Sequence, residues 1–121
     1  AALRQNVGHG EIVVAGYDFG AEIAVELAQA EEDLKAVVVI APVTAGYDFG
    51  RLAALPVPGL VIAGSKDPLT DRRALSELCQ GSGDELMVIP GADHIFSVGL
   101  TAAGRGVALF LAGERAEGAL D

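Results

Sequence analysis

The sequence is poor in several residue types, and each shortage argues against a class of protein. Its one cysteine, Cys79, cannot form an internal disulfide, so nothing indicates an oxidising compartment. No stretch approaches the roughly 20 apolar residues of a membrane-spanning helix, and residues 1–10 lack the apolar run of a signal peptide. Lys and Arg number only 8 against 17 Asp and Glu, a formal charge of −9 that disfavours nucleic-acid and anionic-membrane partners. We therefore expect a cytoplasmic protein that binds neither nucleic acid nor membrane.

Apolar and small residues, in contrast, are in excess. Of the 121 residues 51% are hydrophobic, 16 more are glycine, and the mean hydropathy is +0.42. This composition is too apolar for a disordered acidic chain, and a small domain buries only a modest fraction of its surface. The length predicts one domain, residues 1–121, with residues 113–121 as a frayed tail. The apolar excess indicates missing structure or a partner.

Four short apolar runs predict the strands of a sheet. They are rich in Val and Ile and do not alternate with polar residues, which is typical of parallel strands buried on both faces. The four runs are Glu11–Ala15, Ala36–Ala41, Gly59–Ala63 and Glu85–Ile89.

Helix patterns separate and follow these runs. We expect helices over Ala21–Ala30, over Asp71–Cys79 with Thr70 as its N-cap, and over Leu100–Leu111. Strands that alternate with helices favour right-handed crossovers and a parallel sheet. The predicted fold is therefore α/β, with three layers and a mostly parallel four-stranded sheet flanked by helices.

A glycine-rich turn follows the first predicted strand. Its form, Gly16-Tyr17-Asp18-Phe19-Gly20, resembles a nucleophile elbow, a sharp strand-to-helix turn that exposes its central side chain. Asp18 would project from the turn, and the Phe19 amide would point toward a reacting centre. In the alternative interpretation Asp18 only caps the following helix. A phosphate-binding loop is a weaker interpretation, because Asp18 would repel a phosphate.

Two further polar residues follow later predicted strands. Asp67 comes after the third strand and His94 after the fourth, at the sheet edge where α/β proteins build active sites. A turn role for Asp67 and a solvated loop position for His94 are the alternatives. His9 precedes the first strand, at the opposite edge, and no role is expected for it. The order Asp18, Asp67, His94 is the chain order of the α/β-hydrolase triad.

The hexapeptide AGYDFG occurs twice, at Ala15–Gly20 and at Ala45–Gly50. A duplicated strand–helix unit is one explanation. The flanking residues differ between the copies, however, and this favours coincidence.

Four segments resemble the C-terminal part of small dienelactone-hydrolase-like bacterial hydrolases of the α/β-hydrolase superfamily. They are AGYDFGAEIAVELA, DLKAVVVIAPV, YDFGRLAALPVPGLVIAGSKDPLT and VIPGADHIF. The resemblance implies a hydrolase with Asp18 at the nucleophile position, Asp67 as the acid and His94 as the base. It further implies the Phe19 amide as an oxyanion donor and Tyr17 as a substrate contact, with a small-molecule substrate and neither cofactor nor metal.

The elbow departs from this family, which carries serine where this chain has Asp18. A carboxylate suits attack on an sp³ carbon, as in opening an epoxide or displacing a halide, and leaves an ester that His94-activated water could hydrolyse. Epoxide hydrolases and haloalkane dehalogenases resemble this arrangement. Yet the chain has no tryptophan to bind a halide, and Pro42–Pro58 is too short for a cap domain. The alternative is a catalytically inactive fragment or scaffold that self-associates.

Length is the second departure, because the motifs correspond only to the last four strands of that fold. The Glu11–Ala15 strand, central in a full α/β hydrolase, would form an exposed apolar edge here. We expect a second copy to cover this edge, which makes the protein a homo-oligomer, in the simplest case a homodimer.

Overall fold

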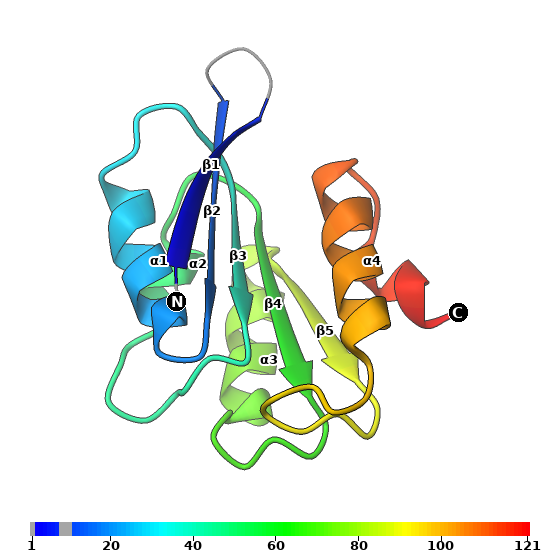
Figure 1. Ribbon diagram of the computed structural model, residues 1–121. Helices are drawn as coiled ribbons and strands as arrows, with labels where there is room; N and C mark the ends of the chain where they lie inside the picture. The colour runs from blue at the N-terminus through cyan, green and yellow to red at the C-terminus, as the bar shows by residue number, and fades with distance from the viewer. Residues whose placement is uncertain (1, 8–10) are drawn as a thin grey trace.

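The computed structural model describes residues 2–7 and 11–121, with side chains described from residue 11 onward. Its centre is a single sheet in the order β1-β2-β3-β4-β5 (Figure 1). Strands β2 to β5 run parallel to one another, and β1 pairs antiparallel with β2. The strands are β1 (Ala2–Val7), β2 (Glu11–Tyr17), β3 (Leu34–Ile40), β4 (Gly59–Gly64) and β5 (Glu85–Ile89).

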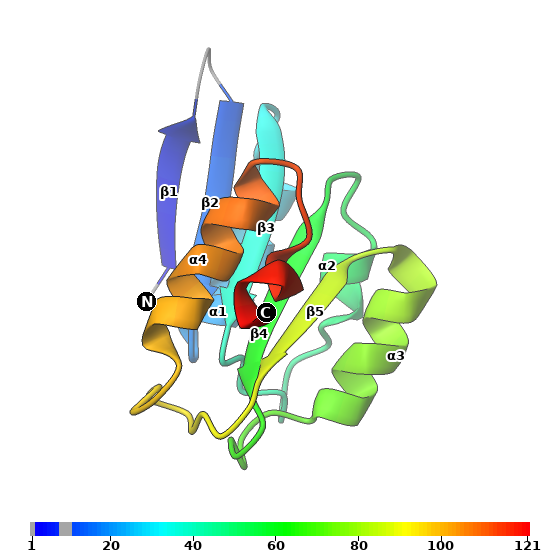
Figure 2. The same cartoon turned by 90° about the vertical axis from the view of Figure 1, so that its right-hand side faces the viewer.

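Helices cover both faces of this sheet, so the molecule has three layers (Figures 1 and 2). Alternate strand residues such as Val14 and Val13 face opposite layers, and each layer is an apolar cluster. One face packs against α1 (Gly20–Gln29), α2 (Gly50–Ala53) and α3 (Arg72–Ser82), and the other against α4 (Leu100–Leu111) and the 3₁₀ helix η1 (Ala116–Leu120). The predicted three-layer α/β fold and its four parallel strands are confirmed.

The predicted exposed edge at Glu11–Ala15 is wrong. Strand β1 pairs with it, from Leu3 opposite Ala15 to Val7 opposite Glu11. The unpaired amides and carbonyls of an apolar edge are costly, and here the chain's own first strand satisfies them. Sequence patterning missed β1 because ALRQNV carries three consecutive polar residues. The unpaired edge that led us to expect an oligomer at Glu11–Ala15 is therefore absent from the structure of the described residues.

The structure also differs from the sequence prediction at the C-terminal segment and at the start of α3. Within the segment predicted to fray, residues 116–120 form η1, and the Glu85 carboxylate accepts hydrogen bonds from the amides of Ala116 (2.9 Å) and Glu117 (3.1 Å). Helix α3 is capped by Asp71 rather than Thr70, since the Asp71 carboxylate accepts from the Ala74 amide at 3.1 Å. Thr70 is therefore not the N-cap that the sequence predicted for this helix.

Candidate functional site

Asp18 lies at the sharp turn between β2 and α1. Its backbone is left-handed, with a φ of 60°, a conformation that non-glycine residues rarely adopt outside functional turns. Its amide donates to the Ile40 carbonyl of the neighbouring strand (3.0 Å), and its carbonyl accepts from the Ala21 amide (3.1 Å). The helix begins with Phe19 as N-cap and has no side-chain cap. The capping interpretation of Asp18 is therefore wrong, and its carboxylate is free to face the sheet edge.

The carboxylates of Asp18 and Asp67 bracket the imidazole of His94. His94 Nε2 lies 2.6 Å from Asp18 Oδ1, and His94 Nδ1 lies 2.7 Å from Asp67 Oδ2. The Asp18 side chain is 34% exposed, that of His94 17%, and that of Asp67 0%. The structure therefore brings all three predicted side chains into one hydrogen-bonded line. Asp18 forms the solvent-exposed end of this line.

Buried donors hold Asp67 in place. Its Oδ1 accepts from the Leu69 amide at 2.9 Å, and the Thr70 hydroxyl lies 3.2 Å from its Oδ2 and 2.7 Å from the Pro42 carbonyl. The sequence predicted Thr70 only as a helix N-cap and not as a contact of Asp67. Donors two and three residues after an aspartate are typical of an Asx turn, and this spacing is visible in the sequence.

The loop that carries His94 is anchored at both ends. The Ser65 hydroxyl accepts from the Gly91 amide (2.7 Å), which ties this loop to the one that carries Asp67. Asp93 accepts from the amide (2.9 Å) and the hydroxyl (2.8 Å) of Ser97. These bonds fix the backbone on either side of His94, so its ring is held without a rigid secondary-structure element.

Tyr17 supports the histidine backbone. Its hydroxyl donates to the His94 carbonyl at 2.7 Å, and the two rings stack with centroids 5.8 Å apart. Burial, followed by the nearby Asp18, Asp67 and Asp93 carboxylates, raises the pKa of Tyr17, so the phenol stays neutral at working pH. The hydroxyl is directed at the histidine backbone, which makes Tyr17 a positioning residue in addition to any substrate contact.

The contacts of the imidazole indicate that it is protonated. A carboxylate only accepts hydrogen bonds, so both His94 nitrogens must carry protons to bind Asp18 and Asp67 together. Partial burial by itself lowers the pKa of His94, but hydrogen bonds from Asp67 and Asp18 outweigh it and raise the pKa above 6.5. The His94 hydrogen bond, followed by the Phe19 amide, lowers the pKa of Asp18. Both the contacts and the raised pKa favour the imidazolium form of His94.

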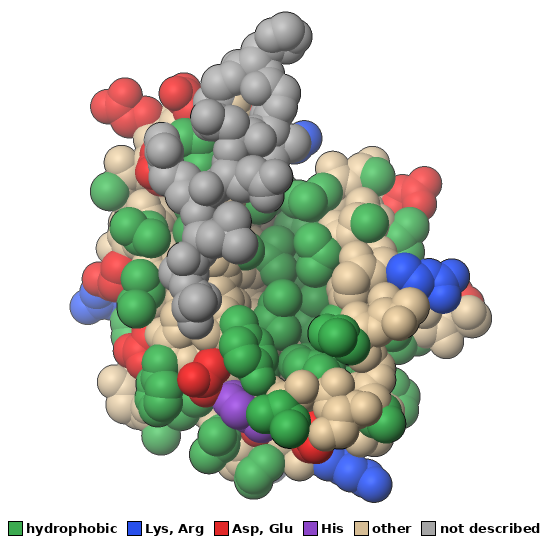
Figure 3. Space-filling model, viewed as in Figure 1, with side chains coloured by type: hydrophobic (Ala, Val, Ile, Leu, Met, Phe, Trp, Pro, Cys, Tyr) green, Lys and Arg blue, Asp and Glu red, His purple; other side chains and the backbone are tan. Residues whose placement is uncertain are grey.

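An apolar groove adjoins this line of residues. It has a volume of about 520 Å³ and lies between α4 and the ends of β2 and β3, where Tyr17, Ile40, Ile95 and Leu100 line it. Hydrophobic side chains gather over the sheet beside α4, with a histidine and acidic side chains at the lower end (Figure 3). Asp18, His94 and Asp67 do not line the groove themselves. Tyr17 does line it, and its ring stacks on that of His94, so the groove borders the site.

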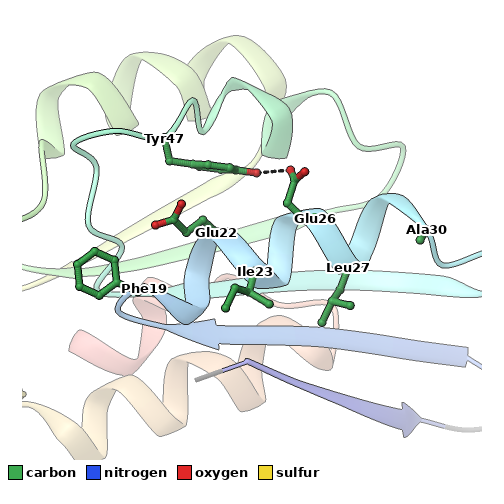
Figure 4. Close-up of a pocket in the computed structure, with 7 residues that line it drawn as sticks. All are labelled: Phe19, Glu22, Ile23, Glu26, Leu27, Ala30 and Tyr47. Atoms are coloured by element: carbon green, nitrogen blue, oxygen red, sulfur yellow. Dashed lines mark hydrogen bonds between the residues drawn. The ribbon is translucent and has the colours of Figure 1, made fainter.

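A second hollow, of about 430 Å³, lies along the outer side of α1. Figure 4 shows Ile23 and Leu27 on one side of the helix and Glu26 reaching toward Tyr47, whose hydroxyl donates to Glu26 at 2.5 Å. That hydrogen bond lowers the pKa of Glu26, which keeps it ionised. Phe19 projects its exposed ring here, while its amide serves Asp18 on the inner side. Tyr17, which contacts His94, does not line this hollow and lines the groove beside α4 instead.

Other kinds of site find little support in the described part of the chain. Residues 2–7 and 11–121 contain no group of three or more His, Cys, Asp or Glu arranged to hold a metal ion. Over the same residues, no helix has both the length and the hydrophobicity to cross a membrane. His9 lies outside the described residues.

Comparison with known proteins gives a consistent family. The profile of the dienelactone hydrolase family matches residues 1–106. An uncharacterized protein of Rickettsia prowazekii is 28% identical over 105 residues, which are 78% of this chain and 44% of the relative. A crystal structure of a protein of unknown function from Agrobacterium tumefaciens, described as a candidate α/β hydrolase, is 32% identical with a TM-score of 0.60, over 69% of this chain and 41% of that one.

A third likeness concerns the fold alone. Est1E from Butyrivibrio proteoclasticus superposes with a TM-score of 0.67 at 15% identity, over 82% of this chain and 59% of its own. The chain spans less than half the length of the Rickettsia and Agrobacterium relatives. The arrangement of the sheet and its helices is that of an α/β-hydrolase fold, as in the Agrobacterium protein.

Proposed function

The chain belongs to the dienelactone hydrolase family, and from this premise we propose that it hydrolyses a small molecule with the Asp18 carboxylate as nucleophile. The observation that carries the proposal is the line Asp18–His94–Asp67, in which His94 Nε2 lies 2.6 Å from Asp18 Oδ1. The left-handed Asp18 backbone places this carboxylate at the exposed end of the line. We further propose a small epoxide as the electrophile.

In the first step, an Asp18 oxygen attacks a ring carbon of the epoxide. A carbon–oxygen ester bond forms, the ring carbon–oxygen bond breaks, and the departing oxygen takes a proton. The imidazolium of His94, hydrogen-bonded to Asp18, is the proton donor. The products are a hydroxyalkyl ester on Asp18 and a neutral His94.

In the second step, the neutral His94 removes a proton from water, which attacks the ester carbonyl carbon. Ester formation has removed the negative charge of Asp18, and the pKa of His94 falls accordingly. Asp67 keeps the proton on Nδ1 and stabilises the imidazolium as it re-forms. The Phe19 amide donates to the oxyanion. The tetrahedral intermediate collapses, the alkoxide takes the carboxyl proton, and the diol leaves.

A halide displacement fits this site less well. A leaving halide takes no proton, so the imidazolium has no role in the first step. Halide sites in this fold rely on tryptophan, as the family resemblance implies, and the chain has none. The two carboxylate contacts of the imidazole, which favour its protonated form, are therefore the observation that supports an epoxide over a haloalkane.

The protonation state predicts the pH dependence of ester formation. Because the pKa of His94 is raised, the imidazolium persists above pH 6.5, and because the pKa of Asp18 is lowered, the nucleophile stays ionised in acid. We expect the single-turnover rate with 1,2-epoxybutane to be flat in acid and to fall about tenfold per pH unit above the pKa of His94. Quenched-flow mass spectrometry measures this rate. With 1-bromobutane, which needs no proton, no such fall is expected; a parallel fall would contradict the role of His94 as acid.

Intact-mass spectrometry tests the nucleophile. His94→Ala removes the base for the second step, so 1-bromobutane should leave one butyl group per chain, and peptide mapping should place it on Asp18. Asp18→Asn in the same background is the matched control and should stay unmodified. The absence of any adduct, together with no turnover of epoxides by the parent chain, would overturn the proposal and favour the inactive scaffold.

A further inference from the structure

The groove beside α4 has walls without charge. Its deeper part is lined by Ile40, Phe96 and Val107, and large apolar side chains form its exposed rim, where Ile95 is 73% and Leu100 69% exposed. No Lys, Arg, Asp or Glu lines it within the described residues. Exposed apolar surface that borders a set of acid–base groups is the usual form of a small-molecule site, and about 520 Å³ falls within the usual size range.

Two carboxylates flank the histidine beside the groove. Asp18 and Asp67 lie 2.6 and 2.7 Å from the imidazole of His94, and this ring stacks on the groove-lining Tyr17. The chain as a whole has a formal charge of −9. An anionic group that entered the groove would meet this field and would lose its hydration against apolar walls.

We infer that the groove binds the non-reacting part of the substrate and selects an uncharged alkyl or aryl group over a carboxylate-bearing one. This inference rests on the proposed function, because it places the electrophile at Asp18. A terminal epoxide on Asp18 would extend its tail past Tyr17 and Ile95 and along α4.

Gly104 lies on α4 among the residues that line the groove. Apart from its chain neighbours and the backbone of its own helix, no heavy atom lies within 4 Å of the position where a Cβ would be. A side chain at this position therefore enters open space in the groove and need not disturb the packing of the helix. A longer apolar side chain here should occupy the volume that the substrate tail needs.

Gly81 offers a matched control. It is also an exposed helical glycine with nothing within 4 Å of its Cβ position, but it lies on α3, at the opposite face of the sheet. Gly104→Leu and Gly81→Leu change helix propensity in the same direction. Only the first should affect ligands of the groove.

The first experiment compares turnover of neutral and anionic epoxides of equal length. We expect kcat/KM to rise about fourfold per added methylene from 1,2-epoxybutane to 1,2-epoxyoctane, the gain for burying one CH₂ group. The carboxylate 7,8-epoxyoctanoate should react on the order of 100-fold more slowly than 1,2-epoxyoctane. Gly104→Leu should abolish the chain-length dependence, and Gly81→Leu should keep it. If 7,8-epoxyoctanoate reacted as fast as 1,2-epoxyoctane or faster, the inference about the groove would be wrong. The role of Asp18 as nucleophile would still be supported.

The second experiment measures binding without any reaction. Titration of octan-1-ol and of octanoate, followed by NMR shifts of the amides of Ile95 and Leu100, reports occupancy of the groove whether or not the chain turns over. We expect octan-1-ol to shift these amides in the parent chain and in Gly81→Leu, and to lose the shift in Gly104→Leu. Alcohol binding without turnover would refute the epoxide reaction alone. Binding of octanoate in preference to the alcohol, or of neither ligand, would refute the apolar groove.

Discussion

Asp67→Asn should lower epoxide turnover by about 10⁴-fold while the chain stays folded. The amide keeps the shape of the carboxylate, and its oxygen can still accept from the Leu69 amide. It cannot supply the buried negative charge that, in the proposed mechanism, stabilises the imidazolium of His94 before the first step and as it re-forms in the second. Steady-state kinetics with 1,2-epoxybutane and NMR titration of the imidazole measure the two consequences. The pKa of His94 should fall together with the rate.

Asp93→Asn provides the matched comparison for this substitution. Asp93 directly precedes His94, but its carboxylate accepts from Ser97 instead of reaching the imidazole. We expect a much smaller loss of turnover from it than from Asp67→Asn. If the two variants lost similar activity, or if Asp67→Asn cost less than about tenfold, Asp67 would not be the partner of the base.

Gly16→Ala should destabilise the chain by about 4 kcal/mol or more, which is a large share of the about 5–15 kcal/mol that stabilises a typical domain. A Cβ on Gly16 would lie 2.1 Å from the Gly20 carbonyl oxygen and 2.8 Å from the Ala24 Cβ, so α1 would have to move away from β2. That movement would also displace Asp18 from His94. Urea unfolding measures the loss of free energy.

Gly46→Ala is the control at the equivalent position of the second AGYDFG. Gly46 has a φ of 83° and nothing within 4 Å of its Cβ position, so only backbone strain of about 1–2 kcal/mol opposes alanine there. Losses of equal size at the two glycines would show that α1 tolerates a shift away from β2, and the close approach would then not be required for folding.

The two copies of AGYDFG show how far sequence could predict this structure. In the first, Asp18 has a φ of 60° and its side chain contacts His94. In the second, the Asp48 carboxylate accepts a hydrogen bond from the Gly50 amide at 2.8 Å, at the start of α2. Phe19 is 59% exposed, whereas Phe49 is 4% exposed. The hexapeptide does not determine these differences. A buried strand before the first copy and a loop before the second do, and that context was visible in the sequence.

Other features depended on contacts between distant residues and could not be predicted in this way. The four parallel strands and the positions of Asp18, Asp67 and His94 followed from apolar runs and from the residues after them. Strand β1 and helix η1 did not, because one depends on pairing with β2 and the other on the Glu85 carboxylate. The bond from the Tyr17 hydroxyl to His94 joins residues that are 77 positions apart, and no local pattern encodes it.

That last bond has a consequence for motion at the site. Tyr17 holds the His94 carbonyl, and the next residue along the chain is Asp18, which holds the His94 ring. We expect a displacement of the β2 end to carry both contacts with it, so that the histidine loop moves together with Asp18. Motion of the loop should then change the position of Asp18 and His94 against a bound ligand more than it changes the distance between them.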